Sequence, residues 1–176
     1  MKILAFGASS SSTSINQQFA CFTASAIADS FTAVSLKDFD CPLYSADEEA
    51  ANGIPENALQ FLGLINEADL LIISFAEHNG SYTAAYKNLF DWMSRHQQKV
   101  FSEKRVVLLA TSPGPGGAQN VLKQAEASMP FFGASVLASF SLPSFYTSFS
   151  AEAFKLVTDE HFQRFDVFTT SVIEQL

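Results

Sequence analysis

The sequence predicts an α/β domain in which helices cover both faces of a parallel five-stranded sheet, so that the elements form three layers. Two observations lead to this fold class. Short apolar runs without polar alternation recur along the chain, as expected for parallel strands that are buried on both faces. Segments with helical spacing of their apolar residues lie between these runs, and strict alternation of strand and helix is typical of a parallel sheet.

The five expected strands differ in how continuous their apolar runs are. Three runs are unbroken and are expected at the centre of the sheet: 3–6, 70–73 and 106–110. Two runs alternate more and are expected nearer its edges: 31–36 and 136–142. Five strands in 176 residues fit the flavodoxin-like strand order 2-1-3-4-5 better than a six-stranded dinucleotide fold.

The helices are expected where apolar residues recur at spacings of three or four. Five segments have this spacing: 15–26, 55–65, 85–92, 118–132 and 151–175. Pro55 suits the first turn of the second helix, where a missing N–H costs nothing. Residues 38–53 are expected to form a long polar connection. No internal repeat or linker interrupts the chain, so residues 1–176 are expected to form a single domain.

Composition and charge exclude several classes of function. With 48% hydrophobic and 16% charged residues, the chain is not expected to be disordered. Its formal net charge is −8 and it has no Lys/Arg cluster, which argues against nucleic acid or an anionic membrane as a partner. Its apolar runs are too short for a signal peptide or a membrane span. Cys21 and Cys41 have no metal-ligand spacing, so we expect a reduced, cytoplasmic protein without a metal site.

The binding site is expected where the strand order reverses, because ligands of open α/β sheets bind outside the carboxyl ends of the strands there. The loops after the first, third and fourth strands should therefore share one crevice. The first of these loops has six consecutive hydroxyl residues, Ser9 to Ser14, at a helix N-terminus. Free N–H groups and hydroxyls can hold a phosphate without Lys or Arg. A solvated turn with a helix cap is the alternative interpretation.

The second and third loops have equally distinctive compositions. Residues 75–82 combine polar groups, a glycine and flanking aromatics, which suits a flat heteroaromatic ligand. Glu77 and His78 could instead act as acid and base, and His78 could simply be an exposed loop residue. Residues 112–117 contain three glycines, which allow close backbone approach. Alone they could form a tight connector; together with the other loops we interpret them as a ligand wall.

Other features of the sequence indicate a ligand site less strongly or not at all. The dinucleotide fingerprint GxGxxG and the phosphate-binding GxxxxGK[ST] motif are both absent. Trp92 lies on the apolar stripe of its helix and is expected in the core. His161 is expected to be a packed structural or interface residue. The aromatic segments 131–132 and 145–149 suit a dimer interface, or a lid over the ligand.

Several of these motifs resemble the NADPH-dependent FMN reductase family, from the first strand to about Pro143. Gly7, Ser9, Ser14 and Asn16 match the family loop Gly-Ser-x-Arg-x-x-Ser-x-Asn with one extra residue, and Ser11 stands where the arginine usually is. A Pro-x-Tyr stretch followed by acids matches residues 42–48. The most specific match is Glu77-His78-Asn79-Gly80-Ser81 with Lys87-Asn88 and Asp91-Trp92, against Pro-Glu-Tyr-Asn-Gly-Ser and Lys-Asn-x-x-Asp-Trp. Ala76 replaces the family proline and His78 its tyrosine.

The resemblance implies a flavodoxin-like FMN protein that takes hydride from NADPH or NADH and passes electrons to a small acceptor. FMN would contact fourteen residues: Ser9, Ser11, Ser14, Ile15, Asn16, Ala76, Glu77, His78, Asn79, Gly80, Ser112, Pro113, Gly114 and Gly117. No residue need act as an acid or base, since the flavin carries the redox chemistry. A homodimer or homotetramer is expected. A flavodoxin-type electron carrier and a degenerate member that binds no flavin remain as alternatives.

Overall fold

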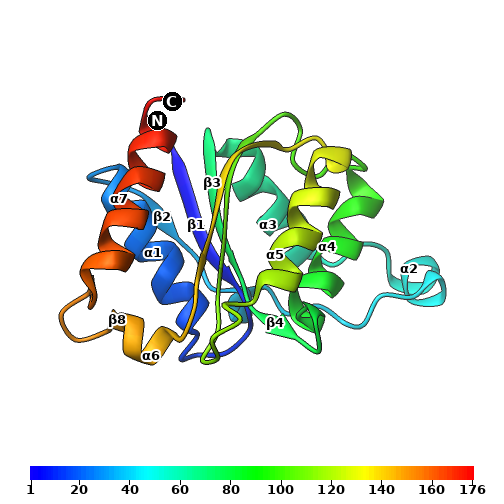
Figure 1. The fold of residues 1–176 in the computed structure, drawn as a ribbon. Coiled ribbons are helices and arrows are strands. Elements are labelled where there is room, and N and C mark those ends of the chain that lie inside the picture. The colour runs from blue at the N-terminus through cyan, green and yellow to red at the C-terminus, as the bar shows by residue number, and fades with distance from the viewer.

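The computed structural model describes residues 1–176, and its centre is a parallel five-stranded sheet (Figure 1). The strands are β1 (Ile3–Ala8), β2 (Thr32–Ala33), β3 (Leu70–Phe75), β6 (Arg105–Thr111) and β7 (Ser135–Leu142). Their order is β2-β1-β3-β6-β7. This confirms the predicted order 2-1-3-4-5, because the intervening β4 (Glu77–His78) and β5 (Ser81–Tyr82) form a separate hairpin.

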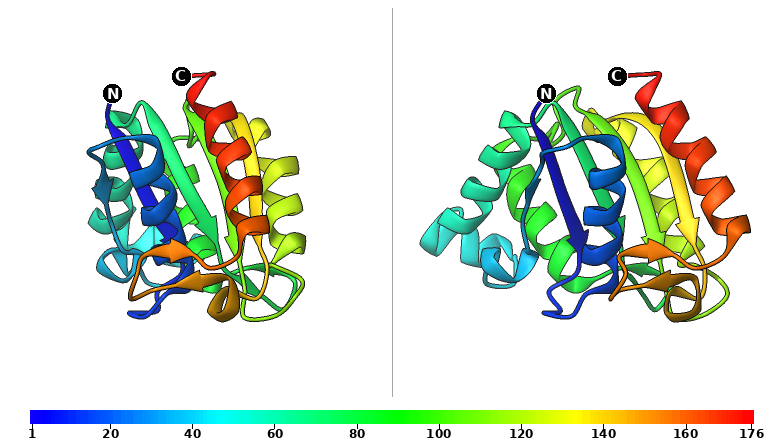
Figure 2. Two further views of the ribbon diagram at one scale, coloured as in Figure 1. Left: turned by 60° about the vertical axis from the view of Figure 1, so that its left-hand side comes forward. Right: turned by 90° about the vertical axis from the view of Figure 1, so that its left-hand side faces the viewer.

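The helices form a layer on each face of the sheet (Figure 2). One layer contains α1 (Ile15–Ile27) and α7 (Asp159–Ile173); the other contains α3 (Glu56–Glu67), α4 (Ala84–His96) and α5 (Gln119–Ser128). Successive residues of β1 point into different cores: Leu4 and Phe6 pack with α3, α4 and α5, whereas Ile3 and Ala5 pack with α1 and α7. Burial on both faces explains why the central strands are continuously apolar.

The prediction of a helix over residues 151–175 was wrong for its first eight residues. Residues after β7 form a one-turn helix, α6 (Phe145–Ser148), and then a hairpin of β8 (Phe149–Ser150) and β9 (Lys155–Leu156). Phe154 has a φ of 48°, which a right-handed helix does not allow. Helix α7 begins after Thr158, whose Oγ1 accepts a hydrogen bond from the His161 N–H.

Two further boundaries differ from the sequence-based expectation. The edge strand β2 has only two residues, and a 3₁₀ turn, η1 (Leu36–Phe39), begins at the last residue of the expected strand 31–36. The expected helix 118–132 ends at Ser128 and continues as a 3₁₀ turn, η2 (Met129–Phe132), which contains Pro130. Proline cannot donate the hydrogen bond that an α-helical turn needs, and the α-helix ends two residues before Pro130.

The long connection 38–53 contains a short helix, α2 (Ala46–Asn52), and is held by α4. Trp92 is fully buried, as expected, and its Nε1 donates to the Pro42 carbonyl at 2.7 Å. Asn88 Nδ2 donates to the same carbonyl at 3.0 Å, and its Oδ1 accepts from the Tyr44 N–H at 2.8 Å. The asparagine and the tryptophan of the Lys-Asn-x-x-Asp-Trp motif therefore fix the path of this connection.

Candidate cofactor-binding site

The loops after β1, β3 and β6 start at one level of the sheet. Ala8 pairs with Phe75, and Phe75 pairs with Ala110, so the three chains leave the sheet side by side. These loops line a shared hollow of about 250 Å³, to which the following residues contribute: Ser9, Ser11, Thr13, Ser14, Ile15, Asn16, Ala76, Glu77, His78, Thr111, Ser112, Pro113 and Tyr146. The expectation that three separate loops meet in one crevice agrees with this geometry.

The hydroxyl-rich first loop leads directly into the N-terminus of α1. Ser14 caps the helix, because its Oγ accepts from the Gln17 N–H at 3.1 Å. The N–H groups of Ile15 and Asn16, in the first turn, make no hydrogen bond within the chain. No Lys or Arg lines the hollow. The donors available to an anion here are therefore backbone N–H groups, the positive end of the helix dipole and hydroxyls.

Gly7 allows β1 and α1 to approach closely at the entrance to this loop. Its N–H donates to Gln17 Oε1 at 2.7 Å. A Cβ atom at this position would lie 2.4 Å from the Gln17 backbone nitrogen and 2.8 Å from the Asn16 carbonyl carbon. Only glycine fits so close to another backbone, so this residue determines where the helix N-terminus lies.

Asn16 joins the three loops through its side chain. The residue is 2% exposed, and its Nδ2 donates to the Thr111 carbonyl at 3.1 Å. Its Oδ1 accepts from the Thr111 N–H at 3.1 Å and from Ser74 Oγ at 2.7 Å. The amide oxygen and one amide proton of Asn16 are thus engaged between α1, β3 and β6, and its backbone N–H has no partner within the chain.

The second loop is a tight hairpin. Asn79 and Gly80 both have positive φ, at 52° and 79°, as a two-residue type I′ turn requires. These two predicted site residues lie at the tip of the turn and do not line the hollow, whereas Ala76, Glu77 and His78 do. The Asn-Gly pair is a strong hairpin signal that our sequence analysis did not use.

Side chains of the hairpin attach it to α5. Ser81 Oγ donates to Gln124 Oε1 at 3.0 Å, and the Tyr82 hydroxyl lies 3.0 Å from Ser128 Oγ. Burial raises the pKa of the Tyr82 phenol, so it stays neutral at physiological pH. The hairpin is therefore fixed along one side of α5.

Glu77 caps α5 from another segment of the chain. Its Oε2 accepts hydrogen bonds from the Asn120 and Val121 N–H groups, both at 3.0 Å, and its Oε1 accepts from Asn120 Nδ2 at 3.3 Å. Helix α5 has no cap of its own, because Ala118 precedes it in a left-handed conformation. The carboxylate neutralises the positive end of α5 and holds the hairpin beside the third loop.

We expect Glu77→Ala to lower the free energy of unfolding by about 1–3 kcal/mol, because two helical N–H groups lose a charged acceptor. Urea denaturation measures this change. Glu77→Gln keeps one acceptor oxygen and should recover part of the loss. Glu160→Ala is the matched control, since Glu160 lies in the first turn of α7 and is exposed. If both alanine variants lose the same stability, the cap contributes nothing.

The third loop contributes fewer ligand-facing residues than predicted. Ser112 and Pro113 line the hollow, but Gly114 and Gly117 do not. Gly117 has a φ of 59°, and a Cβ atom there would lie 2.3 Å from Ser141 Oγ, so packing and backbone conformation explain this glycine. A second hollow of about 360 Å³ adjoins the first and shares Glu77 and Ser112 with it. Together the two hollows provide an elongated site.

Three residues at the hollow were missed by the sequence analysis as site residues. Thr13 belongs to the hydroxyl run but was not singled out. Thr111 is the last residue of β6, and its Oγ1 donates to the Leu142 carbonyl at 2.7 Å. Tyr146 comes from α6, after β7. The aromatic segment 145–149 carried a signal for it, since a lid over the ligand was one of the two interpretations.

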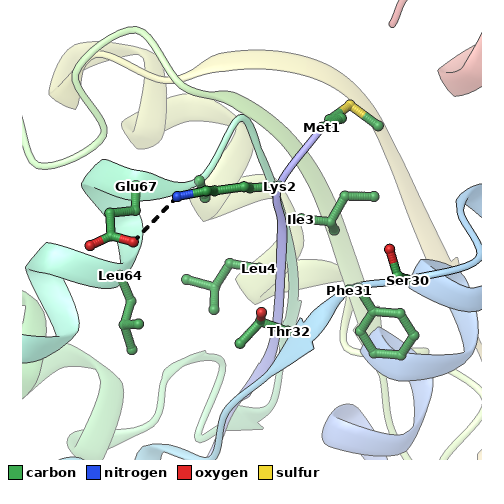
Figure 3. A pocket seen from close by; sticks show the side chains of 10 residues that line it. Met1, Lys2, Ile3, Leu4, Ser30, Phe31, Thr32, Leu64 and Glu67 are labelled. Carbon is green, nitrogen blue, oxygen red and sulfur yellow. Dashed lines mark ion pairs between the residues drawn. The ribbon is translucent and has the colours of Figure 1, made fainter.

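A hollow of about 370 Å³ lies at the other end of the sheet (Figure 3). It forms beside β1 because the short β2 pairs only with Leu4 and Ala5. Its ion pair joins Lys2 Nζ to Glu67 Oε2 at 3.6 Å. Both side chains are more than two-thirds exposed, so the pair contributes little to stability.

No cluster of three or more His, Cys, Asp or Glu residues able to bind a metal occurs in the structure. No helix is both long and apolar enough to span a membrane.

The sheet order, the two helical layers and a ligand-sized hollow at the carboxyl ends of the strands define a flavodoxin-like α/β domain. The family model of NADPH-dependent FMN reductase matches residues 1–147. The chain belongs to this family, as its motifs indicated.

Curated relatives and solved structures agree with this assignment. A quinone reductase of Escherichia coli is 35% identical over 81 residues, which are 46% of this chain and 43% of the relative. An NAD(P)H-dependent FMN reductase of Pseudomonas aeruginosa is 37% identical over 86 residues, which are 47% of this chain and 46% of the relative. The matched stretch thus spans less than half the length of either relative.

The likeness to solved structures extends over the whole chain. The flavoenzyme FerB of Paracoccus denitrificans, an NAD(P)H:acceptor oxidoreductase, superposes with a TM-score of 0.75 and 22% sequence identity. The superposition covers 98% of this chain and 95% of FerB. At this level of identity the comparison establishes the fold.

Proposed function

We propose that the chain binds FMN in the hollow described above and uses it to transfer electrons from NADPH or NADH to a small acceptor. The observation that carries the proposal is the meeting of a hydroxyl-rich helix N-terminus, a flat hairpin and a glycine-rich loop at one hollow. The phosphate would lie at the N-terminus of α1. The ring would extend between the hairpin and the third loop, along the elongated site.

The donors in the hollow fit a phosphate. The first-turn N–H groups of α1 have no partner within the chain, and several hydroxyls lie next to them. The single carboxylate that lines the hollow belongs to Glu77, and it is bound to the N-terminus of α5. An anionic ligand would therefore meet donors and one compensated charge, in a chain whose net charge is −8.

The chain's own residues would bind and orient rather than transfer protons. When bound, FMN supplies the redox chemistry, accepting a hydride from a nicotinamide and delivering electrons to the acceptor. Asn16 and Glu77 would hold the three loops in register around it. Ala76 and the exposed His78 would lie along the ring edge. No side chain at the hollow needs to act as an acid or a base.

The names of relatives support a class of acceptor, and an apolar surface supports an assembly state. Relatives named quinone reductase favour a quinone-type acceptor. An apolar hollow of about 280 Å³ between α4 and η2, lined by Phe90 and Phe132 among others, suits the contacts of a homodimer or homotetramer. Phe131 beside it is 68% exposed. A reduced cytoplasm would keep Cys21 and Cys41 as the free thiols observed.

Anaerobic mixing of the FMN-loaded protein with NADPH tests the function. We expect the flavin absorption band to bleach and to return when a quinone is added. A stable flavin band would indicate an electron carrier of flavodoxin type instead. Protein that remains colourless and shows no thermal shift in excess FMN would indicate a member that binds no flavin. Either of these two results contradicts the proposal.

A further inference from the structure

The one-turn helix α6 is fixed to the third loop of the site. The Ser144 N–H donates to the Gly114 carbonyl at 2.9 Å, and the Phe145 N–H donates to the Ser112 carbonyl at 3.0 Å. Phe145 is 2% exposed, and its ring stacks on Phe149 with centroids 5.1 Å apart. This short segment is therefore attached to the glycine-rich loop, although 30 residues separate Ser144 from Gly114 in the sequence.

A second set of contacts fixes the other end of α6. Ser148 Oγ donates to the Pro143 carbonyl at 2.7 Å and lies 3.0 Å from His161 Nε2. His161 thus has the structural role expected for it, and it holds α6 against α7.

This rigid turn presents a single large side chain to the hollow. Tyr146 is 71% exposed, unlike its buried neighbour Phe145, and it lines the same hollow as Ser9, Ser11 and Ser14. Because the backbone of this turn is already ordered, ligand binding would restrict only the side-chain rotamers of Tyr146. The phenol also adds a hydroxyl donor to the hydroxyls of the first loop.

The hollow has no cation for a phosphate dianion. Its donors come from the first turn of α1 and from hydroxyls, and no Lys or Arg lines it. On this basis, and resting on the proposed function, we propose that Tyr146 is a further cofactor-binding residue, which donates its phenolic O–H to the phosphate of FMN in the hollow that it lines together with Ser14. Tyr146 forms a fourth side of the site, and it makes the site bind FMN more tightly than riboflavin, because riboflavin has no phosphate.

Affinities for FMN and riboflavin, measured by quenching of flavin fluorescence, test this assignment in the full chain. We expect Tyr146→Phe to weaken FMN binding about tenfold, because a hydrogen bond to a charged group is lost, and to leave riboflavin binding unchanged. Tyr146→Ala should reproduce the loss for FMN. The ³¹P signal of bound FMN should also shift in Tyr146→Phe, which a purely structural role of the residue would not cause.

Tyr44→Phe is the matched control, since it removes a phenolic hydroxyl that hydrogen-bonds Glu49 and does not line the hollow. It should leave the preference for FMN unchanged. Unaltered FMN affinity in Tyr146→Phe, or equal losses for both flavins in Tyr146→Ala, would overturn the phosphate contact. If the wild-type chain binds neither flavin, the proposed function fails and the assignment fails with it. If the wild-type chain binds FMN and Tyr146→Phe binds it with the same affinity, only the assignment of Tyr146 is refuted and the proposed function stands.

Discussion

Gly7→Ala is expected to destabilise the domain by about 3 kcal/mol or more and to abolish ligand binding at the hollow. The added methyl group would lie 2.4 Å from the Gln17 backbone nitrogen, so a helix, and not a flexible side chain, would have to move. Moving α1 displaces its first-turn N–H groups and breaks the Asn16 contacts with Thr111 and Ser74. Urea denaturation and FMN titration measure the two effects.

Gly63→Ala is the control for this substitution. Gly63 lies within α3, and a Cβ atom there would have no neighbour within 4 Å. Alanine should therefore stabilise the domain, by about 0.5–1 kcal/mol, because glycine is costly in a helix interior. Equal stability changes in the two variants would show that β1 and α1 do not depend on close approach at Gly7.

Ser14→Ala is expected to weaken FMN binding by about tenfold or more and riboflavin binding much less. The Ser14 Oγ accepts from the Gln17 N–H, which leaves the hydroxyl proton for a phosphate oxygen. Its side chain is 8% exposed and faces the hollow. Calorimetric titration of each variant with both flavins measures the two affinities.

Loss of the helix cap has to be separated from loss of the phosphate contact. Ser45→Ala provides the comparison, because Ser45 caps α2 in the same way, with Oγ accepting from the Glu48 N–H at 3.0 Å, and does not line the hollow. Both substitutions should cost about 1 kcal/mol of stability. Only Ser14→Ala should change the preference for FMN. Equal losses for FMN and riboflavin in Ser14→Ala would place the phosphate elsewhere.

The strand order was predictable because it depends on burial. Continuous apolar runs such as 70–73 are typical of short strands covered on both faces, and helical stripes between them indicate crossovers. The start of α7 was not predictable in this way. Phe154 and Val157 have helical spacing with the residues that follow, yet Phe154 packs on Phe22 and Phe149 from a hairpin. The apolar pattern is the same in both cases, and only tertiary packing distinguishes them.

The site was predictable to the level of loops but not of side-chain roles. Strand ends in a parallel sheet lie together, so composition alone identified the three loops. Asn16 and Glu77 were expected to face the cofactor, but their partners lie 95 and 43 residues away in the sequence. Tyr146 depends on a one-turn helix held by hydrogen bonds to another loop. The aromatic segment 145–149 suggested a lid over the ligand, but no local pattern distinguished a lid from a dimer interface.

Backbone amide shifts recorded by NMR during titration with FMN test most directly whether the three loops form one cofactor site. We predict that the amide signals of residues 9–16, those of Glu77 and His78, and that of Ser112 will shift together and saturate at one FMN per chain. Signals of residues 2–4 and 31–32, around the hollow at the other end of the sheet, should stay in place. Shifts confined to that second group, or to only one of the three loops, would contradict the account.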